Sequence, residues 1–228
     1  MNVILFGASG MIGSGVLLEC LQDPRVRSVL SVGRSPTGRT HPKLKEIVRE
    51  DLFQYADIED DLRDYQACFF CLGVSAAGMS EDAYHRITHD MTLATAGKLV
   101  ELNPGLTFCY VSGEGTDSSE ASRIMWARVK GKTENRLLEL PTETYMFRPG
   151  FVQPMQGVRS RTALYRALYA VAAPLYPVIR RIAPTHVTTS VNLGKAMIRV
   201  GAEGYAKDVL ENVDINSLAE VPRTPEQS

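Results

Sequence analysis

The chain begins with a short apolar run that leads directly into a glycine-rich turn. Val3 to Phe6 precede the sequence Gly7-Ala8-Ser9-Gly10-Met11-Ile12-Gly13, and a helix-compatible segment continues to Leu21. Glycines in this order permit a tight turn, let backbone N–H groups approach a pyrophosphate, and allow a helix to pack closely on a strand. The unpaired N–H groups that begin the helix attract anions. The pattern therefore predicts a dinucleotide-binding turn; the alternative is a glycine-rich turn without a ligand.

Strand-like and helix-like segments alternate through the first two thirds of the chain. Several of the strand candidates are short and apolar on both faces, as a parallel sheet covered by helices requires. The expected strands are Val3 to Phe6, Ser28 to Val32, Glu46 to Glu50, Ala67 to Cys71, Thr107 to Val111 and Thr144 to Phe147. Helices are expected from Glu81 (with Ser80 as N-cap) to Leu102, from Ala121 to Leu140 and from Ser190 to Val200. This alternation predicts an α/β doubly wound parallel sheet, the Rossmann fold.

The last third is expected to complete one domain of 228 residues. Residues 151–190 are interpreted as a lid or substrate-side insertion. Within them, Ala163 to Ile182 is apolar but is interrupted by Pro174 and Pro177, which makes it a poor transmembrane span. One or two short helices here would form a substrate lid or a contact in a homo-oligomer; the alternative is docking on a membrane surface. A final strand is expected from Val209 to Ile215, and the tail after Ala219 is expected to fray.

Charge and cysteine content limit the class of protein. The net charge of -1 and the isoelectric point near 6.4 argue against a nucleic-acid partner. No secretory leader precedes the first strand, so a cytoplasmic protein with reduced cysteines is expected. Cys68 and Cys71 are three residues apart on an expected strand, which places their sulfurs on opposite faces.

A basic segment lies near the end of the chain. Thr144 to Ala202 contains no Asp or Glu but eight Arg and Lys residues, including Arg148 and Arg199. Part of this charge would serve cofactor phosphates or an anionic substrate, or the arginines would form a solvated face.

The end of the second strand indicates which nicotinamide cofactor is preferred. An acidic residue there binds the ribose hydroxyls of NAD, whereas an arginine accommodates the 2′-phosphate of NADP. The sequence reads Val32-Gly33-Arg34-Ser35 and has no acid. Arg34 offers a bidentate fork to phosphate. NADP(H) is therefore preferred and NAD(H) remains open; the alternative is that Arg34 is an exposed loop residue.

Several short motifs follow one another in an order that resembles the short-chain dehydrogenase/reductases. They are the Gly7–Gly13 turn, Asp51-Leu52, Cys71-Leu72-Gly73, Val111-Ser112, Val129-Lys130-Gly131 and Phe147-Arg148-Pro149-Gly150. Together they cover about Met1 to Pro154 and are more specific than the glycines alone. The resemblance is to the small atypical branch that includes Tat-interacting protein and the NmrA-like proteins.

This resemblance implies a role for each matching position. The residues of the glycine turn would hold the pyrophosphate, namely Gly7, Ser9, Gly10, Met11, Ile12 and Gly13. Asp51 and Leu52 would lie against the adenine, and Cys71, Leu72 and Gly73 would line the adenosine. Lys130 would bind the nicotinamide ribose, and Pro149, Gly150 and Phe151 would face the nicotinamide amide. Asp51 as a turn residue and Lys130 as a surface residue are the alternatives.

The catalytic positions are where this chain departs from the family. Family members carry an acid/base tyrosine four residues before the lysine, and Trp126 occupies that position here. An indole N–H donates a hydrogen bond but does not exchange a proton near neutral pH. The family's serine pair reads Ser112-Gly113. Ser112 and Lys130 are therefore the candidate catalytic residues, with Ser112 standing in for the usual serine or that function missing. No metal is expected.

Two functions remain open. The first is an NADP-dependent oxidoreductase or epimerase-like enzyme that acts on a small organic substrate with another proton donor. By chemistry alone, the candidate donors are Tyr84, Tyr110, Tyr145, His85 and His89. The second is an inactive NADP(H)-binding redox sensor that regulates a protein partner, which the missing tyrosine favours.

Overall fold

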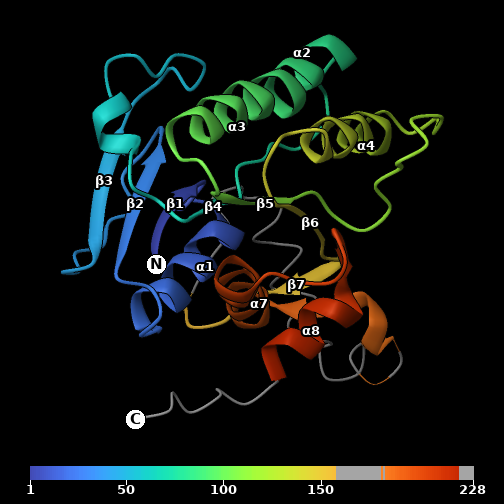
Figure 1. The fold of residues 1–228 in the computed structure, drawn as a ribbon. Helices are drawn as coiled ribbons and strands as arrows, with labels where there is room; N and C mark the ends of the chain where they lie inside the picture. The colour runs from blue at the N-terminus through green and yellow to red at the C-terminus, as the bar shows by residue number, and fades with distance from the viewer. Residues whose placement is uncertain (158–180, 182, 221–228) are drawn as a thin grey trace.

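Seven parallel strands form the centre of the protein (Figure 1). The computed structural model describes residues 1–157, 181 and 183–220, and the architecture below refers to these. The sheet order is β3-β2-β1-β4-β5-β6-β9. Its strands are β1 Asn2–Phe6, β2 Ser28–Gly33, β3 Leu44–Val48, β4 Ala67–Phe70, β5 Thr107–Val111, β6 Thr144–Arg148 and β9 Val209–Glu211. Every neighbouring pair is parallel, which confirms the predicted α/β doubly wound sheet.

Helices cover both faces of this sheet (Figure 1). One face carries α1 (Met11–Gln22), α7 (Ser190–Glu203) and α8 (Asn212–Glu220). The other carries α3 (Met91–Leu102) and α4 (Met125–Leu138), and α2 (Glu81–His85) with the π-helical turn η2 (Arg86–Asp90) leads into α3. Short 3-10 turns, η1 (Glu59–Leu62) and η4 (Pro184–His186), complete the described elements. No helix in these ranges is long and apolar enough to cross a membrane.

The core divides into two apolar clusters because successive strand residues point to opposite faces. Leu5 and Phe69 belong to the cluster under α1 and α7. Phe6 and Phe70 belong to the cluster under α3, where their ring centroids lie 5.3 Å apart. Each fully buried phenylalanine contributes about 2 kcal/mol of hydrophobic stabilisation. The core thereby holds together β1 and β4, the strands at which the chain order of the sheet reverses.

The cysteines follow the same alternation. Cys68 lies in the cluster under α3, and Cys71 packs against the cluster on the opposite face. All four cysteines are free. The prediction that the two sulfurs diverge is confirmed.

A second, two-stranded sheet lies beside the end of β6. It pairs β7 (Phe151–Gln153) with β8 (Val187–Thr189) in parallel. Much of the expected lid, including most of Ala163 to Ile182, lies outside the described residues, since 158–180 and 182 are not described. The expected fraying after Ala219 concerns residues 221–228, which also lie outside them.

Several element boundaries differ from the sequence prediction, most of all the starts of α8 and α4. The expected strand Val209 to Ile215 ends at Glu211, because Asp214 accepts a hydrogen bond from the Glu211 N–H at 3.2 Å and α8 begins at Asn212. The helix expected from Ala121 begins only at Met125.

Asp117 explains this later start. Its carboxylate accepts hydrogen bonds from the N–H groups of Ala121 (3.0 Å) and Ser122 (2.7 Å), which holds these residues in a loop.

Two other elements are close to the prediction. β3 lies at Leu44–Val48 instead of Glu46 to Glu50. Ser80 is confirmed as an N-cap, since its hydroxyl accepts from the Ala83 N–H at 3.3 Å. The helix that it begins is interrupted by the π-helical turn η2, which the sequence did not indicate.

Candidate functional site

The glycine turn between β1 and α1 is tightly packed against the end of β4. Gly7 has a φ of +79°, a conformation that favours glycine. A Cβ on Gly7 would come within 2.7 Å of the Cys71 backbone, and one on Gly13 would come within 2.2 Å of the Gly7 carbonyl oxygen. Larger residues would therefore force the turn, the helix and β4 apart.

The start of α1 has the properties of an anion site. Gly10 is its N-cap, no side chain caps the helix, and its first turn contains no acidic residue. The first N–H groups of a helix have no intrahelical partner and lie at the positive end of its dipole. Ser9, Met11 and Ile12 lie at this same point, at the carboxyl edge of the sheet beside β4. The turn can accept a phosphate through backbone groups.

Two arginines lie together at the ends of β2 and β3. Arg34 is exposed and directly follows Gly33. The backbone N–H of Arg49 donates to the Gly33 carbonyl oxygen at 2.9 Å, so the two arginines emerge side by side. Arg34 was expected here from the sequence, whereas Arg49 was not. Its signal is a basic residue directly after the third strand, at the same edge as Arg34.

The Arg49 side chain is held by the loop that follows it. Its Nε donates to the Asp51 carbonyl oxygen at 2.6 Å, and one terminal nitrogen pairs with Asp57 at 3.0 Å. The other terminal nitrogen, NH1, is buried and has no hydrogen-bond partner among the described residues. A preorganised guanidinium with a spare N–H group suits a phosphate.

The residues expected around adenosine lie on the neighbouring strand ends. The Asp51 carboxylate accepts from the Phe53 N–H at 2.7 Å, so it stabilises its own turn, and Leu52 is buried in the core. The Cys71 N–H donates to the Phe6 carbonyl oxygen at 3.0 Å. This hydrogen bond places the segment after β4, Cys71 to Gly73, beside the glycine turn. Both groups therefore border the same edge as the helix N-terminus.

Lys130 and Ser112 meet at the end of β5. The Lys130 ammonium donates to the Ser112 carbonyl oxygen, and the Ser112 hydroxyl donates to the Phe147 carbonyl oxygen at 3.2 Å. Burial lowers the pKa of Lys130 from its ordinary 10.5 to about 8. Ser112 therefore holds the lysine through its backbone, while its hydroxyl is bonded to β6.

Trp126 lies one helical turn before Lys130, as the spacing predicts. Its indole packs against the loop after β5, since a Cβ on Gly115 would come within 3.3 Å of the ring. An indole therefore occupies the position one helical turn before Lys130.

A carboxylate and an imidazole meet beside this loop. Glu114 is bonded to His186, although they lie 72 residues apart in the sequence. A Cβ on Gly150 would come within 2.2 Å of the Glu114 carboxylate, 2.5 Å of the His186 carbonyl oxygen and 2.7 Å of the Asn212 amide nitrogen. The Glu114 N–H also donates to the Pro149 carbonyl oxygen at 2.9 Å. The sequence analysis missed this pair, because no local pattern links its members.

The Glu114–His186 pair adjoins the lysine. A Cβ added to Gly113, the residue directly before Glu114, would lie 3.9 Å from the Lys130 ammonium nitrogen and 3.8 Å from the Pro149 carbonyl oxygen. Asn212 is buried, and its amide oxygen has no hydrogen-bond partner among the described residues. An acid/base pair, an ammonium and an amide therefore lie around the Pro149-Gly150 segment.

The tyrosines considered as proton donors lie elsewhere. Tyr110 is buried in the core, which raises the pKa of its phenol. Tyr84 is also buried. The Tyr145 hydroxyl accepts from the Tyr205 N–H at 3.1 Å. His85 and His89 interact with Asp90 on η2.

Two arginines of the basic segment are already paired. The guanidinium of Arg148 bonds the buried carboxylate of Glu134, and its pKa is raised by that partner. Arg199 pairs with Glu203 at 3.0 Å. The sequence left open whether this basic segment binds phosphates or forms a solvated face. Because carboxylates hold both guanidinium groups, neither of these two side chains is free for a phosphate.

The chain is similar in sequence to known proteins. The protein fmp52, mitochondrial, of Emericella nidulans is 27% identical over 216 residues, 91% of this chain and 90% of that protein. The protein HTATIP2 of Rattus norvegicus is 26% identical over 152 residues, 65% of this chain and 62% of that protein. No protein-family model matches the chain.

Solved structures show the same fold. A short chain dehydrogenase family protein from Francisella tularensis superposes with a TM-score of 0.62 at 15% identity, over 89% of this chain and 91% of that one. The Bordetella bronchiseptica enzyme WbmF in complex with NAD+ superposes with a TM-score of 0.64 at 14% identity, over 95% and 76%.

The comparisons correct one expectation. Relatives from Emericella nidulans and several Aspergillus species carry mitochondrial names. These names contradict the expected cytoplasmic location, which is therefore wrong. The chain therefore has a Rossmann-type fold and is similar in sequence to the fmp52 proteins and HTATIP2.

Proposed function

We propose that this protein binds NADP(H) and reduces a small organic carbonyl substrate. The observation that carries the proposal is the glycine turn, which packs against β4 and presents an uncapped, acid-free helix N-terminus at the carboxyl edge of the sheet. In open α/β sheets, ligands bind outside the carboxyl ends of the strands where the strand order reverses. The WbmF complex with NAD+ supports a nicotinamide ligand for this fold.

The residues around the turn fit the parts of the cofactor. Backbone groups from Gly7, Ser9, Gly10, Met11, Ile12 and Gly13 would hold the pyrophosphate. Arg34 and Arg49 would bind the 2′-phosphate, because the two arginines lie at the ends of neighbouring strands. Asp51, Leu52, Cys71, Leu72 and Gly73 would border adenosine, Lys130 the ribose, and Pro149, Gly150 and Phe151 the carboxamide. When bound, the cofactor supplies the hydride.

The chain itself must supply a proton to the substrate oxygen. Trp126 cannot do so near neutral pH. We assign this role to His186, held by the Glu114 carboxylate, since an imidazolium is an effective general acid near neutral pH. Ser112 positions Lys130 through its carbonyl oxygen, and the Lys130 charge stabilises the developing oxyanion.

Cofactor binding can be measured through the single tryptophan of the chain. Trp126 lies against the loop after β5, so NADPH should quench its emission and accept energy from it. Turnover is followed as NADPH oxidation with a panel of aldehydes, ketones and quinones. No change in emission with any nicotinamide cofactor would refute the proposed binding.

A His186→Gln variant tests the proton donor. Loss of a general acid lowers kcat by about 100-fold or more, and NADPH affinity should stay at its wild-type value. His41→Gln is the control, since His41 lies before β3 and accepts from the Lys43 N–H. Wild-type kcat in His186→Gln would exclude this residue as the donor.

A second candidate function is a nonenzymatic NADP(H) sensor that binds a protein partner. The observation that favours it is Trp126 in the place of the tyrosine. NADPH binding without oxidation of any substrate in the panel would support this function over the reductase.

The mitochondrial names of the fmp52 relatives support a mitochondrial location for this protein. A fluorescent fusion of the full chain, followed in fractionated cells, tests this placement. Exclusion of the fusion from mitochondria would contradict it.

A further inference from the structure

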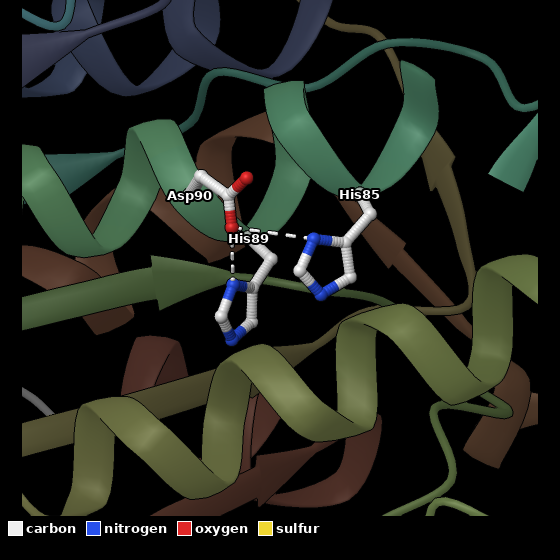
Figure 2. Close-up of side chains that lie close together, drawn as sticks. All are labelled: His85, His89 and Asp90. Carbon is white, nitrogen blue, oxygen red and sulfur yellow. Dashed lines mark hydrogen bonds and ion pairs between the residues drawn. The ribbon is translucent and has the colours of Figure 1, made fainter. Parts of the chain in front are cut away.

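Three side chains of types that can bind a metal ion converge between η2 and α4. His85 and His89 both direct their Nδ1 atoms at one carboxylate oxygen of Asp90, at 3.2 and 2.8 Å (Figure 2). One ligand atom from each residue lies within 4.8 Å of the other two. The two imidazole rings stack with their centroids 4.3 Å apart. The three groups therefore face one small volume.

The π-helical turn is what brings the third group into place. His85 and His89 are four residues apart, so successive turns of a helix put them on one face. Asp90 is five residues after His85, and in a regular α-helix it would be rotated by about 140° away from it. The Met91 N–H donates to the Arg86 carbonyl oxygen, five residues earlier. This wider turn carries Asp90 under His85, and such turns frequently occur at functional sites.

We propose that His85, His89 and Asp90 form a binding site for a divalent transition metal ion of the zinc class. The site supplies two imidazole nitrogens and one carboxylate oxygen, and a water molecule would complete a tetrahedron. Ligands at about 2.05 Å from a tetrahedral zinc ion lie about 3.3 Å from one another. The His85–Asp90 separation of 3.2 Å already matches, and the His89–Asp90 separation of 2.8 Å must open by a few tenths of an ångström.

The ligand set distinguishes between metals. Mg²⁺ and Ca²⁺ require shells made of oxygen atoms, and this cluster offers one carboxylate. Imidazole nitrogens suit zinc, cobalt, nickel and copper. The simpler alternative is a hydrogen bond between His89 and Asp90 and an ion pair between His85 and Asp90, which a metal ion would replace.

Neighbouring charges set the environment of this cluster. Lys132 on α4 places a positive charge near His89. Arg128, also on α4, is paired with Glu81 at 2.7 Å. The carboxylate of Asp90 is the counter-charge within the cluster, so we expect micromolar affinity and not the tighter binding of a structural zinc site.

The test is metal binding to the full chain after treatment with a chelator, in phosphate-free buffer and without nucleotide. Calorimetry with Zn²⁺ should give one ion per chain at micromolar concentration. Co²⁺ should give the visible absorption of a four-coordinate site. His85→Gln, His89→Gln and Asp90→Asn should each weaken Zn²⁺ binding by at least tenfold, because each removes one of three protein ligands. His41→Gln should bind like the wild type.

Either of two results would overturn the proposal. The first is the absence of stoichiometric Zn²⁺ binding at 100 μM metal. The second is binding that none of the three variants weakens, which would place the ion elsewhere. Circular dichroism identifies a variant that does not fold. If a histidine variant does not fold, Asp90→Asn still tests the site, because it preserves the shape of the side chain. Neither result depends on NADP(H), so the test is independent of the proposed function.

Discussion

The pH dependence of protein stability measures how Lys130 is buried at the junction between β5 and α4. Its ammonium is part-buried and bonded to the Ser112 carbonyl oxygen, and burial lowers its pKa from 10.5 to about 8. Lys130→Met removes the titrating group and keeps a chain of similar length. We therefore expect the variant to differ from the wild type in how its stability depends on pH.

The sign follows from the two states of the lysine. The unfolded chain binds the proton with the ordinary pKa of 10.5, whereas the folded chain binds it with a pKa of about 8. Between these pH values the unfolded state holds more protons, so the free energy of unfolding rises with pH. The full cost of burying the charge, roughly 3 kcal/mol, is present below pH 8 and disappears above pH 10.5.

From pH 7 to pH 9 the wild type should gain roughly 1 kcal/mol of stability relative to Lys130→Met. Urea unfolding of the cofactor-free protein at pH 7, 8 and 9 measures this difference, and groups that titrate in both proteins cancel. Lys132→Met, two residues along the same helix, is the control for loss of a lysine as such. Parallel profiles for the wild type and Lys130→Met would refute the reasoning about burial.

Three further substitutions test the cofactor site and its missing tyrosine. Arg34→Ala should weaken NADPH by at least tenfold more than NADH, measured by Trp126 fluorescence, and equal losses would exclude the 2′-phosphate contact. Gly13→Ala should cost about 1–3 kcal/mol in urea unfolding and abolish NADPH binding, because its Cβ would lie 2.2 Å from the Gly7 carbonyl oxygen; retention of both properties would contradict the close approach. Trp126→Tyr should raise the rate of carbonyl reduction by restoring a phenol one turn before Lys130, and an unchanged rate would show that the tyrosine position has no role here.

Much of the fold could be predicted from local sequence. The apolar runs before Gly7 and around Phe70 and Phe108 are buried strands because hydrophobic side chains on both faces require helices above and below the sheet. Boundaries were less predictable. Asp117 delays the start of α4 and Asp214 begins α8, and both act through side-chain hydrogen bonds that apolar periodicity does not report.

The candidate site divides in the same way. The glycine turn and the Trp126–Lys130 spacing depend on near neighbours in the chain, which fix local geometry. Arg49 and the Glu114–His186 pair were missed because their partners come from other strands and loops.

The sequence by itself determined that a strand, a glycine turn and a helix would present N–H groups to an anion, because each of these features depends on residues close together in the chain. Only the tertiary structure decided which distant groups accompany that turn. Parallel pairing sets Arg34 beside Arg49, the return of the chain at η4 carries His186 to Glu114, and the π-helical turn rotates Asp90 under His85. The physical reason is that these contacts depend on strand order and helix register, which many residues determine together.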